Sequence, residues 1–209
     1  MITFSGVDGA GKTTILRNFS DELRNQYGLS LVEIRHRPSI LPILSTLKYG
    51  DRERAEQKTT EVPPRTGKNR SKLSSYLRFF YYLADYIFGQ WVLYLRYTRK
   101  GVIIVYDRYF FDFIVDGRRS NIDVSSRFVE FFYRFVIKPE INVFLYAKPD
   151  VILARKTELD SETISRLTEG YLDLFHRLNM KQRGEYLAIE NLSQFETVRK
   201  IRDIFWTRN

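Results

Sequence analysis

A glycine-rich segment near the start of the chain limits most strongly how this sequence can fold. It reads Gly6-Val7-Asp8-Gly9-Ala10-Gly11-Lys12-Thr13 and fits the G-x-x-x-x-G-K-[ST] pattern. The apolar run Ile2 to Phe4 precedes it, and a stretch of helical periodicity, Thr13 to Tyr27, follows it. Glycines let the backbone curl so that consecutive N–H groups and the N-terminus of a helix face phosphate groups. The segment therefore predicts a strand, a phosphate-binding loop and a helix in direct succession.

The residues of this loop have distinct expected roles in holding a nucleotide. Lys12 is expected to reach the β- and γ-phosphates, and the Thr13 hydroxyl is expected to ligate magnesium. We expect nucleotide contacts from Gly6, Asp8, Gly9, Ala10, Gly11, Lys12, Thr13 and Thr14. The loop alone predicts a bound nucleotide and leaves the reaction open.

The rest of the chain alternates apolar, β-rich runs with longer stretches of helical period. The runs are Ile2 to Phe4, Leu31 to Ile34, Val102 to Tyr106, Ile141 to Tyr146 and Tyr186 to Ile189. Besides Thr13 to Tyr27, the helical stretches are Ser71 to Arg99, Val124 to Val136, Pro149 to Lys156, Glu162 to Leu178 and Gln194 to Phe205, with Gly89 as a candidate break. This alternation predicts one α/β domain over residues 1–209, with three α/β/α layers and a mostly five-stranded parallel sheet.

Composition narrows the class of protein further. The 209 residues include no cysteine, which excludes a disulfide framework, a thiolate nucleophile and cysteine-ligated zinc. The apolar run at the start of the chain is interrupted at once by Ser5-Gly6. The most hydrophobic stretch, Tyr76 to Tyr97, contains the charged residues Arg78, Asp85 and Arg96. We therefore expect a cytoplasmic protein with no membrane partner. The net charge of +9 predicts an anionic partner.

One segment, Lys48 to Lys72, does not fit a packed element. Its apolar residues are Tyr49, Ala55 and Val62, and it has eight basic residues against four acidic ones. We expect a mobile basic loop over residues 48–72. Two interpretations stay open: a solvated loop, or a flap that gathers anions beside the active site.

Three charged residues follow the third and fourth apolar runs. Asp107, at the end of a strand beside the phosphate loop, is placed to hold the magnesium shell or to orient the attacking oxygen. Arg108 offers a planar fork that matches a phosphate group. Arg155 could neutralise charge that develops in the transition state. With Lys12, these residues are the predicted catalytic set, and Thr13 and Asp107 are the predicted metal ligands.

The segment Phe4 to Thr14 and the triplet Asp107-Arg108-Tyr109 resemble the phosphate loop and the D-R-Y/H motif of the thymidylate kinases. Arg155 resembles in its position the arginine-containing start of the lid of these kinases, and the corresponding lid in this chain is expected over residues 156–164. The resemblance implies a P-loop NTPase fold of kinase type, ATP as phosphoryl donor, Mg²⁺, and a homodimer. We expect acceptor contacts from Asp8, Arg37, Phe80, Tyr86, Arg108 and Tyr109. The chain departs from the pattern at Tyr86, where the family has an arginine that contacts the acceptor.

The leading hypothesis is ATP- and Mg²⁺-dependent phosphoryl transfer to a small phosphorylated acceptor, above all a nucleoside monophosphate. The partners are then small phosphate substrates, and nucleic acid is not expected. One alternative is a kinase for an unphosphorylated nucleoside or sugar, whose hydroxyls Asp112 or Asp116 could bind. The other is a non-catalytic nucleotide-binding protein that touches nucleic acid through residues 48–72.

Overall fold

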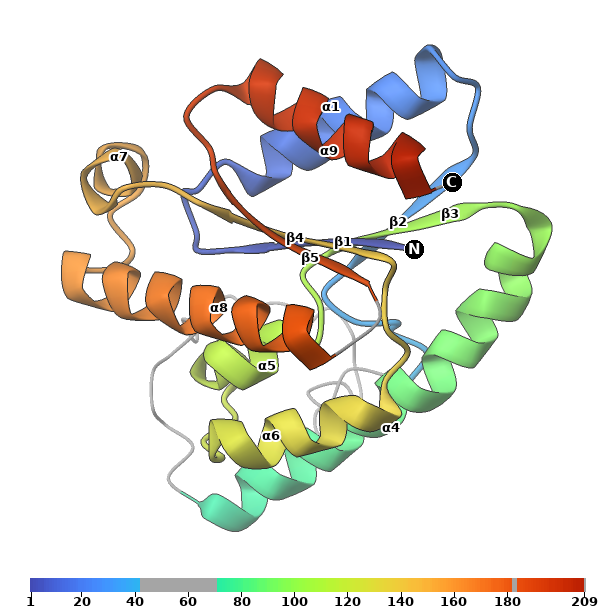
Figure 1. Cartoon of the computed structure of the whole chain (residues 1–209). Coiled ribbons are helices and arrows are strands. Elements are labelled where there is room, and N and C mark those ends of the chain that lie inside the picture. Colours follow the sequence, from blue (N-terminus) through green and yellow to red (C-terminus); the bar gives the residue numbers. More distant parts are fainter. Residues whose placement is uncertain (42–70, 182–183, 209) are drawn as a thin grey trace, which may run out of the picture.

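The computed structural model describes residues 1–41, 71–181 and 184–208. Five parallel strands form one sheet in the order β2-β3-β1-β4-β5 (Figure 1). Their bounds are β1 (Ile2–Gly6), β2 (Leu31–Arg35), β3 (Ile103–Asp107), β4 (Ile141–Tyr146) and β5 (Glu185–Glu190). In the register of the sheet, Phe4 on the central strand lies beside Asp107 of β3 and Val143 of β4. The phosphate loop and the Asp107 motif therefore leave the sheet at neighbouring strand ends.

Helices cover both faces of the sheet (Figure 1). One face carries α1 (Lys12–Asn25) and α9 (Gln194–Arg208), and the other carries α4 (Lys72–Arg96), α5 (Phe111–Val115), α6 (Ser126–Phe132) and α8 (Ser161–Lys181). A further helix, α7 (Pro149–Arg155), lies beyond the end of β4, and the short 3₁₀ helices are η1 (Thr98–Lys100), η2 (Gly117–Ser120) and η3 (Tyr133–Phe135). The predicted three-layer α/β/α fold with a parallel sheet is confirmed.

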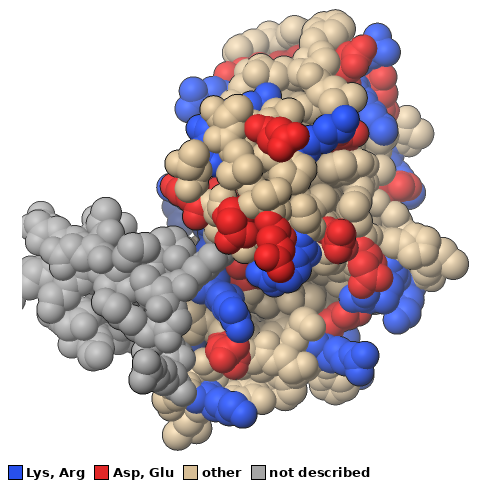
Figure 2. Space-filling model, turned by 90° about the vertical axis from the view of Figure 1, so that its left-hand side faces the viewer, with Lys and Arg blue, Asp and Glu red and all other residues tan. Residues whose placement is uncertain are grey.

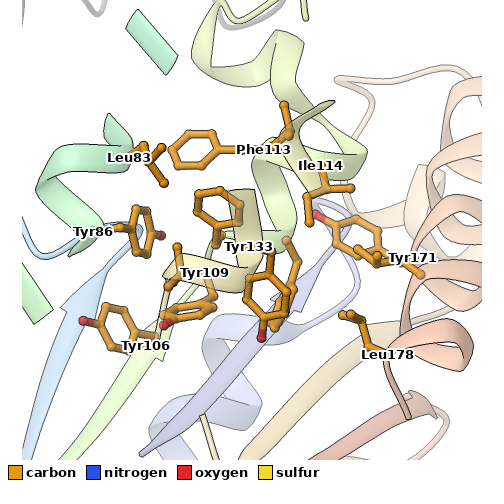
Figure 3. Packing of buried hydrophobic residues seen from close by; sticks show 14 of the residues in the cluster. Leu83, Tyr86, Tyr106, Tyr109, Phe113, Ile114, Tyr133, Tyr171 and Leu178 are labelled. Carbon is orange, nitrogen blue, oxygen red and sulfur yellow. The ribbon is translucent and has the colours of Figure 1, made fainter. Parts of the chain in front are cut away.

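The core on the α4 and α8 side is built largely from aromatic rings (Figure 3). Tyr86 from α4, Tyr109 from the end of β3, Tyr133 from η3 and Tyr171 from α8 are all almost completely buried. Neighbouring rings meet mostly edge to face, as between Tyr86 and Tyr109 at a centroid distance of 5.3 Å. Aromatic rings bury large apolar areas in such pairs. This cluster includes Tyr106 of β3 and Phe144 of β4, so it packs closely against the strands that lead to the phosphate loop side of the sheet.

Some element boundaries differ from those expected from the sequence. Helix α4 runs unbroken through Gly89. The glycine serves close packing instead of a break: a Cβ there would lie 2.5 Å from the Pro38 Cβ, so its absence lets the β2–α4 connection approach the helix. The helix expected over Val124 to Val136 divides into α6 and η3, and α5 was missed because it has only five residues.

One of two predicted segments, the basic loop, lies mostly outside the described residues, and the other, the lid, is described in full. Of the basic loop expected over 48–72, residues 48–70 lie outside the described residues. The lid expected over 156–164 comprises a connection from α7 and the first turn of α8, which begins at Ser161. Within the described ranges, no helix is both long enough and apolar enough to cross a membrane.

Candidate active site

The phosphate loop connects the buried end of β1 to the first turn of α1. Gly11 has a left-handed backbone, with φ at 85°, and a Cβ there would lie 2.5 Å from the Asn191 side-chain nitrogen. Only glycine fits both constraints. Asn191 follows β5 and donates from Nδ2 to the Ala10 carbonyl at 2.9 Å, while Thr197 donates to Asn191 Oδ1 at 3.2 Å. Asn191 therefore positions the loop, a role that the sequence motif did not reveal.

A cleft of about 430 Å³ opens beside this loop. Four residues of the predicted catalytic and metal set line it together: Lys12, Thr13, Asp107 and Arg108. The remaining lining residues are Asp8, Arg35, His36, Arg78, Tyr82, Arg119, Ser120, Asn121 and Lys156. The fold thus joins the two sequence motifs in one cavity, since both sit at carboxyl ends of adjacent parallel strands.

Lys12 and Asp107 face each other across the cleft. The Lys12 Nζ lies 3.6 Å from Asp107 Oδ1, and the lysine side chain is only 7% exposed. Burial lowers the pKa of Lys12, and the positive charge of Arg108 acts in the same direction. A desolvated ammonium group of this kind interacts strongly with phosphate oxygens.

The same corner suits a magnesium ion. Asp107 Oδ1 is buried and accepts no hydrogen bond from the described part of the chain, and the Thr13 hydroxyl belongs to the same cleft. Magnesium prefers oxygen ligands and is commonly held by one or two protein groups, waters and substrate phosphates. The described residues contain no group of three His, Cys, Asp or Glu side chains that could hold a metal by themselves. The residues therefore fit an ion that is shared with a bound nucleotide.

Arg108 is held by contacts on several sides. Its Nη2 lies 2.6 Å from Asp8 Oδ1, and its Nη1 donates to Asp112 Oδ1 at 2.7 Å and to the Gly6 carbonyl at 3.2 Å. Arg119 pairs with the other oxygen of Asp8, so that this carboxylate lies between two guanidinium groups. Burial alone would raise the pKa of Asp8, but the charges of the two arginines outweigh it and lower the pKa. Asp8 is therefore ionised at neutral pH.

Asp112, on α5, holds the far side of Arg108 and is 1% exposed. Its Oδ1 also accepts from the Tyr171 hydroxyl at 2.8 Å, and its Oδ2 accepts from the Ser5 hydroxyl at 3.0 Å. Burial would raise the pKa of Asp112, but the charge of Arg108 lowers it. The hypothesis that Asp112 binds substrate hydroxyls is corrected by this geometry, because both of its oxygens are already engaged in the interior.

His36 lies in the cleft directly after β2. Its backbone N–H donates to the Asp107 carbonyl at 2.7 Å, and its ring contacts the Phe113 ring at a centroid distance of 5.2 Å. Burial lowers the pKa of His36 to about 4, so that the imidazole is neutral at pH 7. His36 therefore lines the cleft as a neutral ring.

Arg155 ends α7 above the phosphate loop. Its Nη1 lies 3.4 Å from the Gly9 carbonyl, so the predicted transition-state residue is close to the loop. Lys156 follows it, lines the cleft and pairs with Glu158 at 2.9 Å. Thr14, also expected to touch the nucleotide, is exposed in the first turn of α1.

Three predicted acceptor residues are held inside the protein, and their contact with an acceptor stays a prediction. Tyr86 and Tyr109 are completely buried, and their hydroxyls donate to the carbonyls of His36 and Ile137. Arg37 is buried and pairs with Asp85 at 2.5 Å. None of these three side chains lines the cleft.

The fourth predicted acceptor residue, Phe80, also lies away from the cleft, for a different reason. It lies on the outer side of α4, 44% exposed, and packs against Phe132 at 5.4 Å. The residues of α4 that line the cleft are Arg78 and Tyr82, which are one helical turn apart.

Comparisons with known proteins agree with this fold and cleft. The chain is 27% identical over 187 residues to a probable thymidylate kinase of Sulfolobus acidocaldarius, covering 86% of this chain and 84% of that protein. It is 26% identical over 197 residues to the thymidylate kinase of Oenococcus oeni, with 90% and 80% covered. No profile of a known protein family matches the chain.

A solved structure shows the same fold. The crystal structure of thymidylate kinase from Ehrlichia chaffeensis superposes with a TM-score of 0.60 at 17% identity, covering 96% of this chain and 97% of that one. The phosphate loop, the cleft and these likenesses together define an enzyme of the kinase type built on a P-loop. Within that class, the chain is similar to the thymidylate kinases in sequence and in fold.

Proposed function

We propose that this protein transfers the γ-phosphoryl group of ATP to a small phosphorylated acceptor, in the first place a nucleoside monophosphate. The observation that carries the proposal is the single cleft in which Lys12, Asp107 and Arg108 converge beside the phosphate loop. The names of the two sequence relatives support the same reaction class.

On the donor side, the loop from Gly9 to Thr13 binds the triphosphate with its backbone N–H groups. Lys12 lies against the β- and γ-phosphates, where its buried charge attracts their oxygens most strongly. Thr13 and Asp107 are the residues that would hold Mg²⁺, which supplies charge neutralisation of the phosphates when bound. Arg155, close to Gly9, adds positive charge beside the transferred group.

On the acceptor side, the nucleophile is an oxygen of the acceptor's phosphate. That oxygen is already largely ionised at neutral pH, because the second pKa of a phosphomonoester is about 6, so no general base is needed. A new bond forms between this oxygen and the γ-phosphorus, the bond to the β–γ bridging oxygen breaks, and its electron pair leaves with ADP. We propose that residues 156–164 act as a lid that excludes water during this step.

ADP release, with ATP and Mg²⁺ present, tests the proposal against its alternatives. The panel contains thymidylate, other nucleoside monophosphates, the matching nucleosides, sugar phosphates and free sugars. We expect stimulation by one or more phosphorylated compounds and none by their unphosphorylated counterparts. Stimulation by nucleosides or sugars alone would favour the alternative kinase, and the absence of stimulation by every phosphorylated compound would overturn the proposal.

The face of the molecule seen in Figure 2 gives no support to the nucleic-acid alternative, and residues 48–70, through which that alternative would act, lie outside the described residues. On the face seen in Figure 2, acidic and basic side chains lie next to one another and form no continuous basic stripe. Nucleic-acid interfaces typically present clustered positive charge. We propose that the partners are small phosphate substrates and that the protein works in the cytoplasm.

We further propose a homodimer, on the evidence of one face of α4. Large apolar side chains that are 44–70% exposed form a stripe along this helix: Leu73, Leu77, Phe80, Phe88, Trp91 and Leu95. The stripe is symmetric about Ala84, with partners four, seven and eleven residues to either side. Antiparallel pairing of two copies would place Phe80 on Phe88, Leu77 on Trp91 and Leu73 on Leu95, as a two-fold axis requires.

The size of the stripe also suits a second copy of the chain. Its side chains expose on the order of 700 Å² of apolar surface, close to the roughly 800 Å² that each partner buries in a typical stable interface. A patch of this size is unusual on a monomer. The helix lies at the outer edge of the molecule, where a second copy can approach (Figure 1).

A charge placed in the stripe should therefore separate the dimer. Light scattering coupled to gel filtration is expected to give twice the chain mass of 24.9 kDa for the wild type and the single-chain mass for Leu77→Glu and Trp91→Glu. Phe195→Glu is the matched control, because this exposed aromatic residue lies on α9, on the opposite face of the sheet. A monomeric wild type at tens of micromolar would contradict the proposal.

A further inference from the structure

The backbone of Arg108 is strained. Its φ is 77°, in the left-handed region that residues with long side chains rarely adopt. The chain turns sharply there, so that the guanidinium group of Arg108 reaches Asp8 in the cleft while the next side chain, Tyr109, is completely buried in the core. Strain of this kind persists only where the surrounding structure holds it, and it is common at functional sites. The residues that hold Arg108 in this conformation are therefore candidates for a functional role.

A closed ring of three hydrogen bonds fixes Tyr109. Gln90 Nε2, on α4, donates to the Tyr109 hydroxyl, and this hydroxyl donates to the Ile137 carbonyl at 2.5 Å. The Ile137 N–H in turn donates to Gln90 Oε1 at 2.9 Å. Burial raises the pKa of Tyr109 well above its usual value, so the hydroxyl keeps the proton that it donates. These three residues, the Gln90 clamp, connect α4 to the segment that precedes β4.

The aromatic ring of Tyr109 is held as firmly as its hydroxyl. It packs against Tyr106 at a centroid distance of 5.1 Å and also contacts Tyr86 (Figure 3). On the other side of the turn, the N–H of Arg108 donates to the Phe4 carbonyl of β1 at 2.7 Å. The backbone of Arg108 is therefore fixed on both sides, by the sheet before it and by the Gln90 clamp after it.

Helix α4 holds the neighbouring strand end in a similar way. His36, directly after β2, also has a left-handed backbone, with φ at 67°. Its carbonyl accepts a hydrogen bond from the Tyr86 hydroxyl. Tyr86 and Gln90 are four positions apart, so they lie one turn apart on the buried face of the helix. This face of α4 thus holds two adjacent strand ends that both line the cleft.

We propose that Gln90 is a positioning residue for phosphoryl transfer: through the Tyr109 hydroxyl it holds the backbone of Arg108 so that the guanidinium group faces the phosphate of the acceptor. This inference rests on the proposed function and adds to it a residue that does not line the cleft. Gln90 is 3% exposed, and a buried amide is unfavourable unless its polar atoms are paired. Methionine, which is also long and unbranched, would serve packing alone. The clamp accounts for the amide.

Gln90→Met breaks the clamp and keeps the side chain long and unbranched. We expect kcat/KM for the acceptor to fall at least tenfold, because Arg108 is no longer held; the acceptor is thymidylate or the panel compound that is turned over fastest. The KM for ATP should change less than twofold, because the phosphate loop and Lys12 hold the donor. Tyr109→Phe removes only the hydroxyl and should give the same split. The double variant should lose less than threefold more, because both changes break one clamp.

Leu93→Val is the matched control. Leu93 is buried on α4, three positions after Gln90, and takes no part in the clamp. This variant should lower the melting temperature and keep wild-type kinetics, which separates a loss of stability from a loss of positioning. A loss smaller than tenfold in both Gln90→Met and Tyr109→Phe, or an equal loss in Leu93→Val, would overturn the inference and leave the proposed reaction standing. If the wild type turns over no phosphorylated compound, the proposed function itself fails and this inference with it.

Discussion

Replacing Lys12 with alanine is expected to lower kcat/KM for phosphoryl transfer about a thousandfold, because a buried cation aimed at the transferred group is lost. The lysine is 7% exposed and lies at the centre of the cleft, 3.6 Å from Asp107. Burying a charge costs free energy, so its removal should leave the fold intact. ADP formation with the best acceptor of the panel, together with a thermal melt, measures both effects.

Arg17→Ala is the matched control for Lys12→Ala. It removes one positive charge from the same helix at an exposed position outside the cleft, and it should retain wild-type kinetics. A Lys12→Ala variant that keeps a tenth or more of the wild-type kcat/KM would contradict the assigned role of this lysine.

Asp112→Ala should lower the free energy of unfolding by about 3 kcal/mol or more, since removing one partner of a buried ion pair leaves an uncompensated charge. The carboxylate is 1% exposed and holds Arg108, Tyr171 and Ser5. Arg108 keeps Asp8 and the Gly6 carbonyl, which places the expected loss towards the lower end of the usual range. Urea denaturation at pH 7, followed by circular dichroism, gives the value.

Tyr171→Phe separates the ion pair from the hydrogen bond in this network. It removes one hydroxyl donor to Asp112 and keeps the ring, so the expected loss is about 1 kcal/mol. Equal losses for Asp112→Ala and Tyr171→Phe would show that Arg108 does not depend on Asp112.

The fold could be predicted from the sequence because its signals are local. The strands of a parallel sheet are buried on both faces and read as short apolar runs, as Ile141 to Tyr146 does. The phosphate loop fixed the order of the first strand and helix, and Gly11 in its left-handed conformation shows why the pattern demands glycine there. The short α5 gave no periodic signal, since five residues make little more than one turn.

The site could be predicted only where function and motif coincide. Lys12, Thr13, Asp107 and Arg108 follow strand ends that meet at one edge, so sequence position implied proximity. The side chains of α4 that line the cleft could not be predicted, because α4 carries aromatic residues on nearly every face and periodicity could not tell Tyr82, in the cleft, from Tyr86, in the core. Arg119 and Asn191 reach the site through tertiary contacts, which no local pattern encodes.

The hydrogen bond from Asn191 to Ala10 also affects how the protein folds during its synthesis on the ribosome. It joins residues that are 181 positions apart in the chain. The phosphate loop lies within the first thirteen residues, so it gains this support only after β5 has been synthesised. Contacts of such long range form late and slow the folding of a chain. A nascent chain that lacks β5 should therefore hold nucleotide weakly, and tight binding should begin only as synthesis nears residue 191.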